Sequence, residues 1–341
     1  MKKIIIIGGG FAGAYCAWKL EKDFDVTLID TKDYFEFTPS VLRTLVEPNH
    51  AVKIEVCHQT YLLKAQVLNE EVLSITDTLV KTTEKKISYD YLIIATGSRY
   101  NLPIKEKNMV IAERGEELRK YSHKLEDAQN ILIIGGGLVG VELAAEISAT
   151  YPEKKIKIVH AHAELIERNP VKARMYVRKF LEKKRVEFIC NERVVNHKKG
   201  VYLTDKKTSI SGDMAFLCTG IVPNYESLQN FVLTDKKYLQ VNDYLQVPGH
   251  FHIFAAGDIA GVEEEKTAQN AEMQAAVVVK NIYNLDNGKS LQKYVSSARI
   301  MVISLGKWNG MLLYKNFVLT GFIPGILKRL IEWKTMRKDR E

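Results

Sequence analysis

The chain has 341 residues, of which 46% are hydrophobic and 26% are charged, and its formal net charge is +8. This composition is that of a globular protein with room for two or three domains. No apolar run is long enough to cross a bilayer as a helix, and no signal peptide precedes the first apolar run, so we expect a protein that is not secreted. Because most Lys and Arg residues are scattered along the chain, nucleic acid is not an expected partner.

A glycine-rich motif follows the first apolar run. Residues 2–7 predict a buried strand, Gly8, Gly10 and Gly13 give the spacing G-x-G-x-x-G, and residues 14–20 predict a helix. In this order the first glycine allows a sharp turn, the second lets a pyrophosphate approach, and the third lets the helix pack on the strand. The N–H groups at the start of the helix would then face the phosphates.

The same motif occurs a second time. Residues 130–134 predict a strand, Gly135, Gly137 and Gly140 repeat the glycine spacing, and residues 141–149 predict the next helix. Either motif alone is also compatible with a glycine-rich turn in an ordinary α/β sheet. The two copies together predict two bound dinucleotides and electron transfer between them.

The similarity between the two halves continues beyond the glycines. Residues 25–30 predict a second strand that ends on Asp30, about 20 residues after the first glycine, where an acid binds the adenosine ribose or merely caps a turn. The corresponding strand, residues 155–160, ends on His160. Apolar strands also end in Thr-Gly at Thr96-Gly97 and at Thr219-Gly220, so the sequence contains an internal repeat. We therefore predict an α/β fold with two Rossmann-like domains and a C-terminal segment.

With these landmarks, nearly the whole chain resembles the two-dinucleotide flavoproteins of the pyridine nucleotide-disulfide oxidoreductase superfamily. Within that superfamily it resembles the type II NADH:quinone dehydrogenases, and most of all the apoptosis-inducing-factor-like ferroptosis suppressor group. The matching segments are residues 135–137, 140–147, 151–154 and 333–337. The resemblance implies an FAD-binding domain at residues 1–108 and 234–297, an NAD(P)H-binding domain at 109–233, and a C-terminal segment at 298–341.

The resemblance assigns the first glycine motif to FAD. The residues that it implies for FAD binding are Gly8, Gly9, Gly10, Phe11, Ala12, Gly13, Asp30, Arg43, Val67, Thr96, Gly97, Asp258, Thr267 and Ala268. It assigns the second motif to NADH or NADPH. The residues that it implies there are Gly135, Gly137, Leu138, Val139, Gly140, Glu142, His160 and Gly220. Because a neutral His160 does not repel a 2′-phosphate, the sequence leaves the choice of nucleotide open.

The helix predicted from Thr267 to Asn284 resembles the one that lines the quinone pocket of type II dehydrogenases, although a plain amphipathic helix is the alternative. Its start, together with Lys266, would stabilise the negative charge of a reduced flavin. The residues implied for the quinone are Phe37, Pro39, Gln269, Met273 and Gln274. The catalytic roles are implied for Glu142, Lys266 and Gln269, and no metal is expected.

Together these expectations predict an FAD-dependent NAD(P)H:quinone oxidoreductase. In this reaction a hydride passes from NAD(P)H to flavin N5, and two electrons then pass from the reduced flavin to a membrane quinone. A ferredoxin- or rubredoxin-type reductase with a protein acceptor is one alternative. An apoptosis-inducing-factor-like redox sensor or interaction protein is another. Sulfide:quinone and disulfide reductases are disfavoured, because the four cysteines include no close pair in the sequence.

The C-terminal segment contains a predicted amphipathic helix. Ile326, Leu327, Leu330, Ile331 and Trp333 fall on one side, and Lys328, Arg329 and Glu332 fall on another. Such a helix lies in a membrane interface or docks on the body of the protein or across a dimer. We expect a peripheral protein on the cytoplasmic side of a membrane, and the sequence leaves open whether it forms a homodimer.

Overall fold

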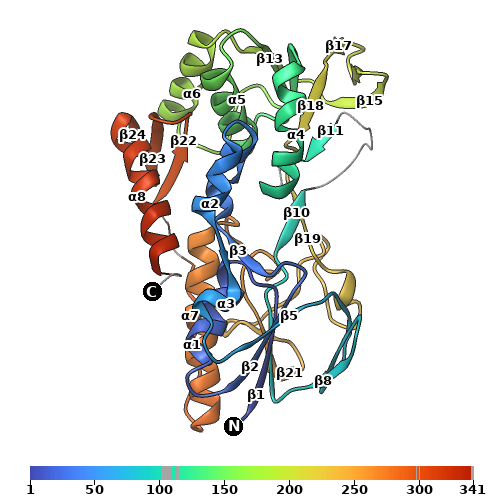
Figure 1. The fold of residues 1–341 in the computed structure, drawn as a ribbon, viewed down its shortest axis with the longest axis vertical. Coiled ribbons are helices and arrows are strands. Elements are labelled where there is room, and N and C mark those ends of the chain that lie inside the picture. The colour runs from blue at the N-terminus through green and yellow to red at the C-terminus, as the bar shows by residue number, and fades with distance from the viewer. Residues whose placement is uncertain (101–108, 112–114, 297, 299, 339–341) are drawn as a thin grey trace.

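The structure is a computed structural model that describes residues 1–100, 109–111, 115–296, 298 and 300–338. Two α/β units lie end to end along the long axis, and a smaller C-terminal piece lies beside the second unit (Figure 1). Residues around the predicted domain boundary at 108, namely 101–108 and 112–114, and the end of the predicted C-terminal segment, 339–341, lie outside the described residues.

The first unit is built on a six-stranded sheet with the order β20-β21-β9-β1-β2-β5. Its strands are parallel except for β20. The bounds are β1 (Lys3–Ile7), β2 (Asp25–Asp30), β5 (Gln66–Asn69), β9 (Tyr91–Ile94), β20 (Gln246–Val247) and β21 (His250–Ala255). Strands β20 and β21 come from residues far along the chain, so this sheet is assembled from two separate segments. Helix α1 (Phe11–Leu20) packs against α7 (Ala268–Asp286) on one side of it.

The second unit repeats this plan with a five-stranded parallel sheet of order β11-β18-β12-β13-β14. Its elements are β11 (Met109–Ile111), α4 (Gly115–Asp127), β12 (Asn130–Ile134), α5 (Leu138–Thr150), β13 (Lys155–His160), α6 (Val171–Lys183), β14 (Glu187–Cys190) and β18 (Met214–Leu217). In both sheets the strand before the glycines lies between the strand ending in Asp30 or His160 and the strand that precedes Thr-Gly. The internal repeat read from the sequence is therefore present in three dimensions.

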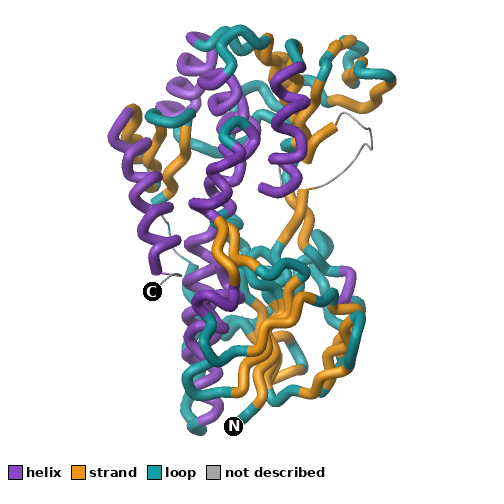
Figure 2. The backbone as a smooth tube through the Cα atoms, viewed as in Figure 1, coloured by secondary structure: helices purple, strands orange, loops and turns teal. Residues whose placement is uncertain are grey.

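Shorter elements surround the two sheets (Figure 2). In the first unit they are β3 (Tyr34–Glu36), η1 (Thr38–Leu45), η2 (Pro48–His50), α2 (Ala51–Ile54), β4 (Glu55–Cys57), α3 (His58–Tyr61), β6 (Val72–Ile75), β7 (Leu79–Thr82), β8 (Lys86–Ser88) and η3 (Glu226–Leu228). The second unit adds β15 (Val194–Lys198), β16 (Val201–Thr204) and β17 (Ser209–Ser211). Strands β10 (Ser98–Tyr100) and β19 (Ile221–Pro223) pair antiparallel and connect the two units.

Burial explains the uniformly apolar sequences of the central strands. Residues 4–7 of β1 and 131–134 of β12 are all buried, as expected for parallel strands covered on both faces. Cys16 and Cys218 are buried in the same hydrophobic core. Burial raises the pKa of the Cys16 thiol and raises that of Cys218 to about 12.

The C-terminal piece is a three-stranded antiparallel sheet followed by a long helix. Its elements are β22 (Met301–Ser304), β23 (Gly310–Tyr314), β24 (Phe317–Gly321) and α8 (Phe322–Lys338). Helix α8 buries Lys328 and Glu332, each 8% exposed, against the body of the protein, whereas Leu330 is 54% and Trp333 57% exposed. The helix therefore docks through Lys328 and Glu332 together with Met336, which is 4% exposed, and leaves Leu330 and Trp333 exposed. No helix within the described residues is long and apolar enough to span a membrane.

Candidate functional site

The first glycine turn lies directly against neighbouring backbone at two of its glycines. A Cβ on Gly8, whose φ is +100°, would lie 2.2 Å from the carbonyl oxygen of Ala95, and a Cβ on Gly13 would lie 1.8 Å from that of Gly8. A Cβ on Gly10 would instead meet nothing within 4 Å. The turn is thus packed tightly on the protein side and open at Gly10, where a pyrophosphate would approach.

The second turn has the same geometry. A Cβ on Gly135, with φ of +112°, would lie 2.2 Å from the carbonyl oxygen of Cys218, and one on Gly140 would lie 2.0 Å from that of Gly135. Gly137 is open in the same way as Gly10. Two helices, α1 and α5, therefore begin at turns of matching shape, with their unpaired N–H groups at the open glycine.

The residue at the end of the second strand contacts the glycine turn in both units. The Gly9 N–H donates to Oδ2 of Asp30, and Oδ1 of the same carboxylate accepts from the N–H of Lys32 at 2.9 Å. In the second unit the Gly136 N–H donates to Nδ1 of His160 at 3.1 Å. His160 thus occupies in the second unit the position that Asp30 occupies in the first, without supplying a negative charge.

A cleft of about 470 Å³ extends from the first glycine turn to the start of α7. The residues predicted for FAD that line it are Gly8, Gly9, Gly10, Phe11, Ala12, Asp30, Thr96, Gly97, Asp258, Thr267 and Ala268. Lys266 lines it as well, and its Nζ donates to the carbonyl oxygen of Ala260 at 2.6 Å. The pKa of Lys266 is lowered, because the effect of burial outweighs the nearby charges of Asp258 and Glu264, which act to raise it. The structure therefore brings together residues separated by more than 250 positions in the sequence.

Several residues of this cleft are not predicted from the sequence. They include Lys32, Glu36, Thr38, Glu70, Ser98 and Asn224. Asn224 is held by Thr96, whose Oγ1 donates to its carbonyl oxygen at 2.9 Å and whose own carbonyl accepts from Asn224 Nδ2 at 2.7 Å. Ser98 Oγ donates to Oδ2 of Asp258 at 2.7 Å. These residues belong to no motif, and only the fold places them at the cleft.

His58 is a further residue that the sequence analysis missed. Its Nδ1 lies 2.6 Å from the hydroxyl of Tyr61, and its Nε2 is buried without a hydrogen-bond partner among the described residues. A Cβ on Gly9 would lie only 2.4 Å from this Nε2. Burial lowers the pKa of His58 to about 4, despite the charge of Asp30, which raises it. A neutral imidazole thus supports the glycine turn beside Asp30.

Two residues predicted for FAD, Arg43 and Val67, and the third glycine of that turn do not line this cleft. Gly13 packs against the turn itself, and Val67 lies in β5, paired with Leu28 of β2. Arg43, in η1, is buried and forms an ion pair with Glu146 of α5 at 2.8 Å. Arg43 therefore joins the first unit to the second.

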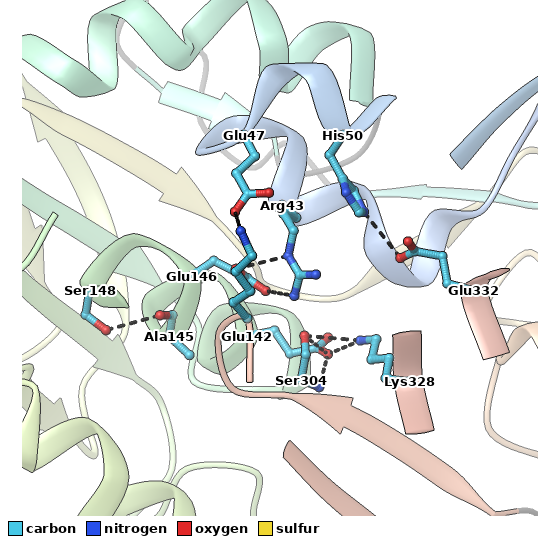
Figure 3. Close-up of polar contacts among 11 residues, drawn as sticks. Arg43, Glu47, His50, Glu142, Ala145, Glu146, Ser148, Ser304, Lys328 and Glu332 are labelled. Atoms are coloured by element: carbon cyan, nitrogen blue, oxygen red, sulfur yellow. Dashed lines mark hydrogen bonds and ion pairs between the residues drawn. The ribbon is translucent and has the colours of Figure 1, made fainter. Parts of the chain in front are cut away.

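A cluster of charged side chains surrounds that ion pair (Figure 3). Oε1 of Glu142 accepts from Lys328 Nζ at 2.6 Å and from the Ser304 N–H at 2.8 Å. His50 Nε2 lies 3.2 Å from Oε2 of Glu332. These contacts connect α8 to α5 and to η2, and α5 to β22. Arg43, Glu142, Glu146, Ser304, Lys328 and Glu332 line a cavity of about 10 Å³, roughly enough for one water. The predicted nicotinamide contact, Glu142, is thus held by the C-terminal piece.

The residues predicted for the quinone are not gathered in one cavity. Phe37 is buried against Phe11, and Pro39 lines the small cavity beside Arg43. Gln274 is buried, with Oε1 accepting from the Gly257 N–H at 2.8 Å. Gln269 and Met273 are exposed on α7.

A family model described as pyridine nucleotide-disulphide oxidoreductase matches residues 2–275. The chain belongs to this family. Because the family is FAD-dependent and uses pyridine nucleotides, the predicted cofactors, FAD and NADH or NADPH, are confirmed, and the protein is an oxidoreductase. The predicted recognition of the ferroptosis suppressor group is confirmed by the relatives described next.

The apoptosis-inducing factor homolog B of Dictyostelium discoideum is 33% identical over 91% of this chain and 89% of that protein. The ferroptosis suppressor protein 1 of Homo sapiens is 30% identical over 98% of this chain and 96% of that protein. Among solved structures, NDH2 from Plasmodium falciparum in complex with NADH has a TM-score of 0.90 at 16% identity and covers 99% of this chain and 96% of that one. The sulfide:quinone oxidoreductase of Aquifex aeolicus has a TM-score of 0.88 at 20% identity and covers 100% and 92%. The structural matches show a shared fold.

The buried His58 predicts an acid-dependent loss of stability. Because its pKa is about 4 in the folded protein and 6.5 when exposed, the unfolded state binds the proton first as the pH falls. His58 therefore stabilises fully above pH 6.5, and up to about 3 kcal/mol is lost between pH 6.5 and 4. Urea unfolding of His58→Asn should show a shallower decline over this range than the wild type. His123→Asn, at a side chain that is 90% exposed, is the control and should keep the wild-type slope. Equal slopes for the wild type and His58→Asn would contradict this assignment.

Proposed function

We propose that the protein is an FAD-dependent NAD(P)H:quinone oxidoreductase. The observation that carries the proposal is the pair of matching glycine turns, each open at one glycine and each followed by a helix N-terminus. We call each glycine turn, together with the helix N-terminus that follows it, a cradle: the first is formed by residues 8–13 and the start of α1, and the second by residues 135–140 and the start of α5. One chain with two cradles is suited to holding two dinucleotides, one as a resident cofactor and one as a substrate.

FAD is assigned to the first cradle, because its cleft continues past the glycine turn to Asp258 and the start of α7. The residues proposed to hold it are those predicted for FAD that line the cleft, together with Lys32, Ser98 and Asn224. When bound, FAD would supply an acceptor for the hydride of NAD(P)H and a two-electron donor for the next acceptor. The N-terminus of α7 and the Lys266 ammonium would favour negative charge at this end of the cleft.

The nicotinamide nucleotide is assigned to the second cradle. Gly135, Gly137, Leu138, Val139 and Gly140 would bind its pyrophosphate, His160 and Gly220 would border it, and Glu142 would face its nicotinamide end. The contacts of Glu142 with Ser304 and Lys328 fix the carboxylate in position. A residue whose orientation is fixed in advance loses less entropy when substrate binds.

A membrane quinone is favoured over a protein acceptor by the outer face of the C-terminal piece. Its exposed apolar residues include Trp308, Phe317, Phe322, Ile323, Ile326, Leu330 and Trp333, and we call these seven the C-terminal apolar face. Arg329 lies over the ring of Trp308, 4.4 Å from its centroid, and Arg337 lies over Trp333. Aromatic side chains flanked by arginines are typical of surfaces that bind a membrane interface. A peripheral location on the cytoplasmic side of a membrane is part of the proposal.

Quinone turnover tests the proposed reaction. The purified protein reconstituted with FAD should oxidise NADH or NADPH steadily when a short-chain ubiquinone or menaquinone analogue is present, and much more slowly with dioxygen alone. The measurement is nucleotide absorbance with and without quinone. Flavin reduction that no quinone accelerates into turnover would contradict the proposal and favour a protein acceptor or a redox sensor.

Membrane binding is tested by changing the C-terminal apolar face without removing the helix. Truncation before Lys328 would remove Lys328 and Glu332 and so leave Glu142 and His50 without these buried partners. Point substitutions on the exposed side of the helix are therefore the cleaner test. The double variant Leu330→Asp with Trp333→Asp should lower binding to vesicles of anionic and zwitterionic lipid at least about tenfold in co-sedimentation. The reason is that charged groups replace apolar side chains that the membrane interface would otherwise bury. The exposed pair Leu63→Asp and Val52→Asp is the control. Equal binding by both double variants would contradict the assignment.

A further inference from the structure

The second cradle lacks the usual acid at the end of its second strand, yet an acid from another segment lies beside it. His160 uses Nδ1 to accept from the Gly136 N–H at 3.1 Å. Its Nε2 lies 3.2 Å from Oε2 of Glu167. In the first cradle the corresponding contact from Gly9 goes directly to Asp30. His160 therefore stands between the glycine turn and a carboxylate.

The loop after β13 folds back over the glycine turn and so positions Glu167. The Ile166 N–H donates to the carbonyl oxygen of Gly136 at 2.9 Å. Leu165 packs beneath the same glycine, where a Cβ would lie 2.4 Å from its Cδ2. Asn169 closes the loop with a backbone hydrogen bond to Ile166. Glu167 is thus fixed next to the turn at which the nucleotide is assigned.

The side chain of Glu167 is a negatively charged carboxylate. Burial raises its pKa, but its own backbone N–H and the hydrogen bond from His160 together outweigh this and lower the pKa. The other group within reach is His162, whose Nε2 lies 3.8 Å from Oε1. Arg174 is paired with Glu164 and so does not neutralise Glu167. The side chain is 33% exposed, so a ligand can reach it.

We propose that Glu167 determines nucleotide specificity by facing the adenosine ribose of NADH and repelling the 2′-phosphate of NADPH. The inference rests on the proposed function and goes beyond it by selecting NADH. The chemistry is that of the acid at the end of the second strand, which binds a ribose diol and disfavours a phosphate. Here the acid comes from a residue seven positions later, with His160 holding the turn in place of the missing carboxylate.

Nucleotide binding and flavin reduction measured without quinone test this inference. The FAD-loaded wild type should bind NADH and be reduced by it with an efficiency at least about tenfold above that for NADPH. Glu167→Gln should remove most of that preference by weakening NADH binding and tightening NADPH binding. The limiting rate of flavin reduction at saturating nucleotide should change little, because the adenosine end is remote from the hydride. Stopped-flow absorbance over a range of nucleotide concentrations separates the two parameters.

Two further variants make the result specific. Glu164→Gln removes the same charge three residues away and should keep the NADH preference. His160→Asp combined with Glu167→Gln places an acid at the position equivalent to Asp30 and should restore the preference.

An unchanged preference in Glu167→Gln, or an equal shift in Glu164→Gln, would overturn the inference while leaving the oxidoreductase proposal intact. Failure of both nucleotides to bind the wild type would overturn both. Failure only in the quinone assay would leave the nucleotide preference measurable.

Discussion

The contact on which the structure depends is the approach of a helix to the turn that precedes it, which occurs twice and allows no Cβ. At Gly13 and at Gly140 an added Cβ would lie within about 2 Å of a carbonyl oxygen of the turn. This approach directs the first N–H groups of α1 and α5 at the open glycine of each turn. Because the contact is made by backbone alone, it shapes both cradles in the same way, and differences between them arise from the side chains around them.

Those surrounding side chains also join the parts of the molecule. Arg43 and Glu146 form a buried ion pair between the two units, and Lys328 and Glu332 attach α8 through Glu142 and His50. Breaking a buried ion pair leaves a charge without compensation, so such contacts specify one arrangement more than they add net stability. In this arrangement Lys328, Glu332 and Met336 of α8 are buried, whereas Leu330 and Trp333 are exposed. The same helix therefore connects the unit proposed to bind the nicotinamide nucleotide to the face proposed to contact the membrane.

The sequence was sufficient for features that depend on local backbone geometry. The glycine spacing, the apolar strands and the position of Asp30 predicted the two units, because each is required within a single strand, turn and helix. Side chains that only long-range folding brings together could not be predicted in the same way. His58 and Asn224 belong to no motif, Glu167 reaches its position only through a loop that folds back, and the inward orientation of Lys328 depends on partners in distant segments. The predicted quinone residues lie at buried, exposed and inter-unit positions, because they were selected by family resemblance in two separate segments, near Phe37 and near Gln269, and not from a cavity.

The central claim is that two cradles of equal shape hold two different dinucleotides, and a pair of valine substitutions tests it most directly. Gly10→Val and Gly137→Val each place a side chain in open space, at residues with φ of −75° and −72°, so the fold should tolerate both. The measurement is FAD content by absorbance together with the Kd for NADH. The account predicts that Gly10→Val loses bound FAD, and that Gly137→Val keeps FAD but binds NADH at least about tenfold more weakly. Loss of FAD in Gly137→Val, or full retention of both ligands in either variant, would contradict it.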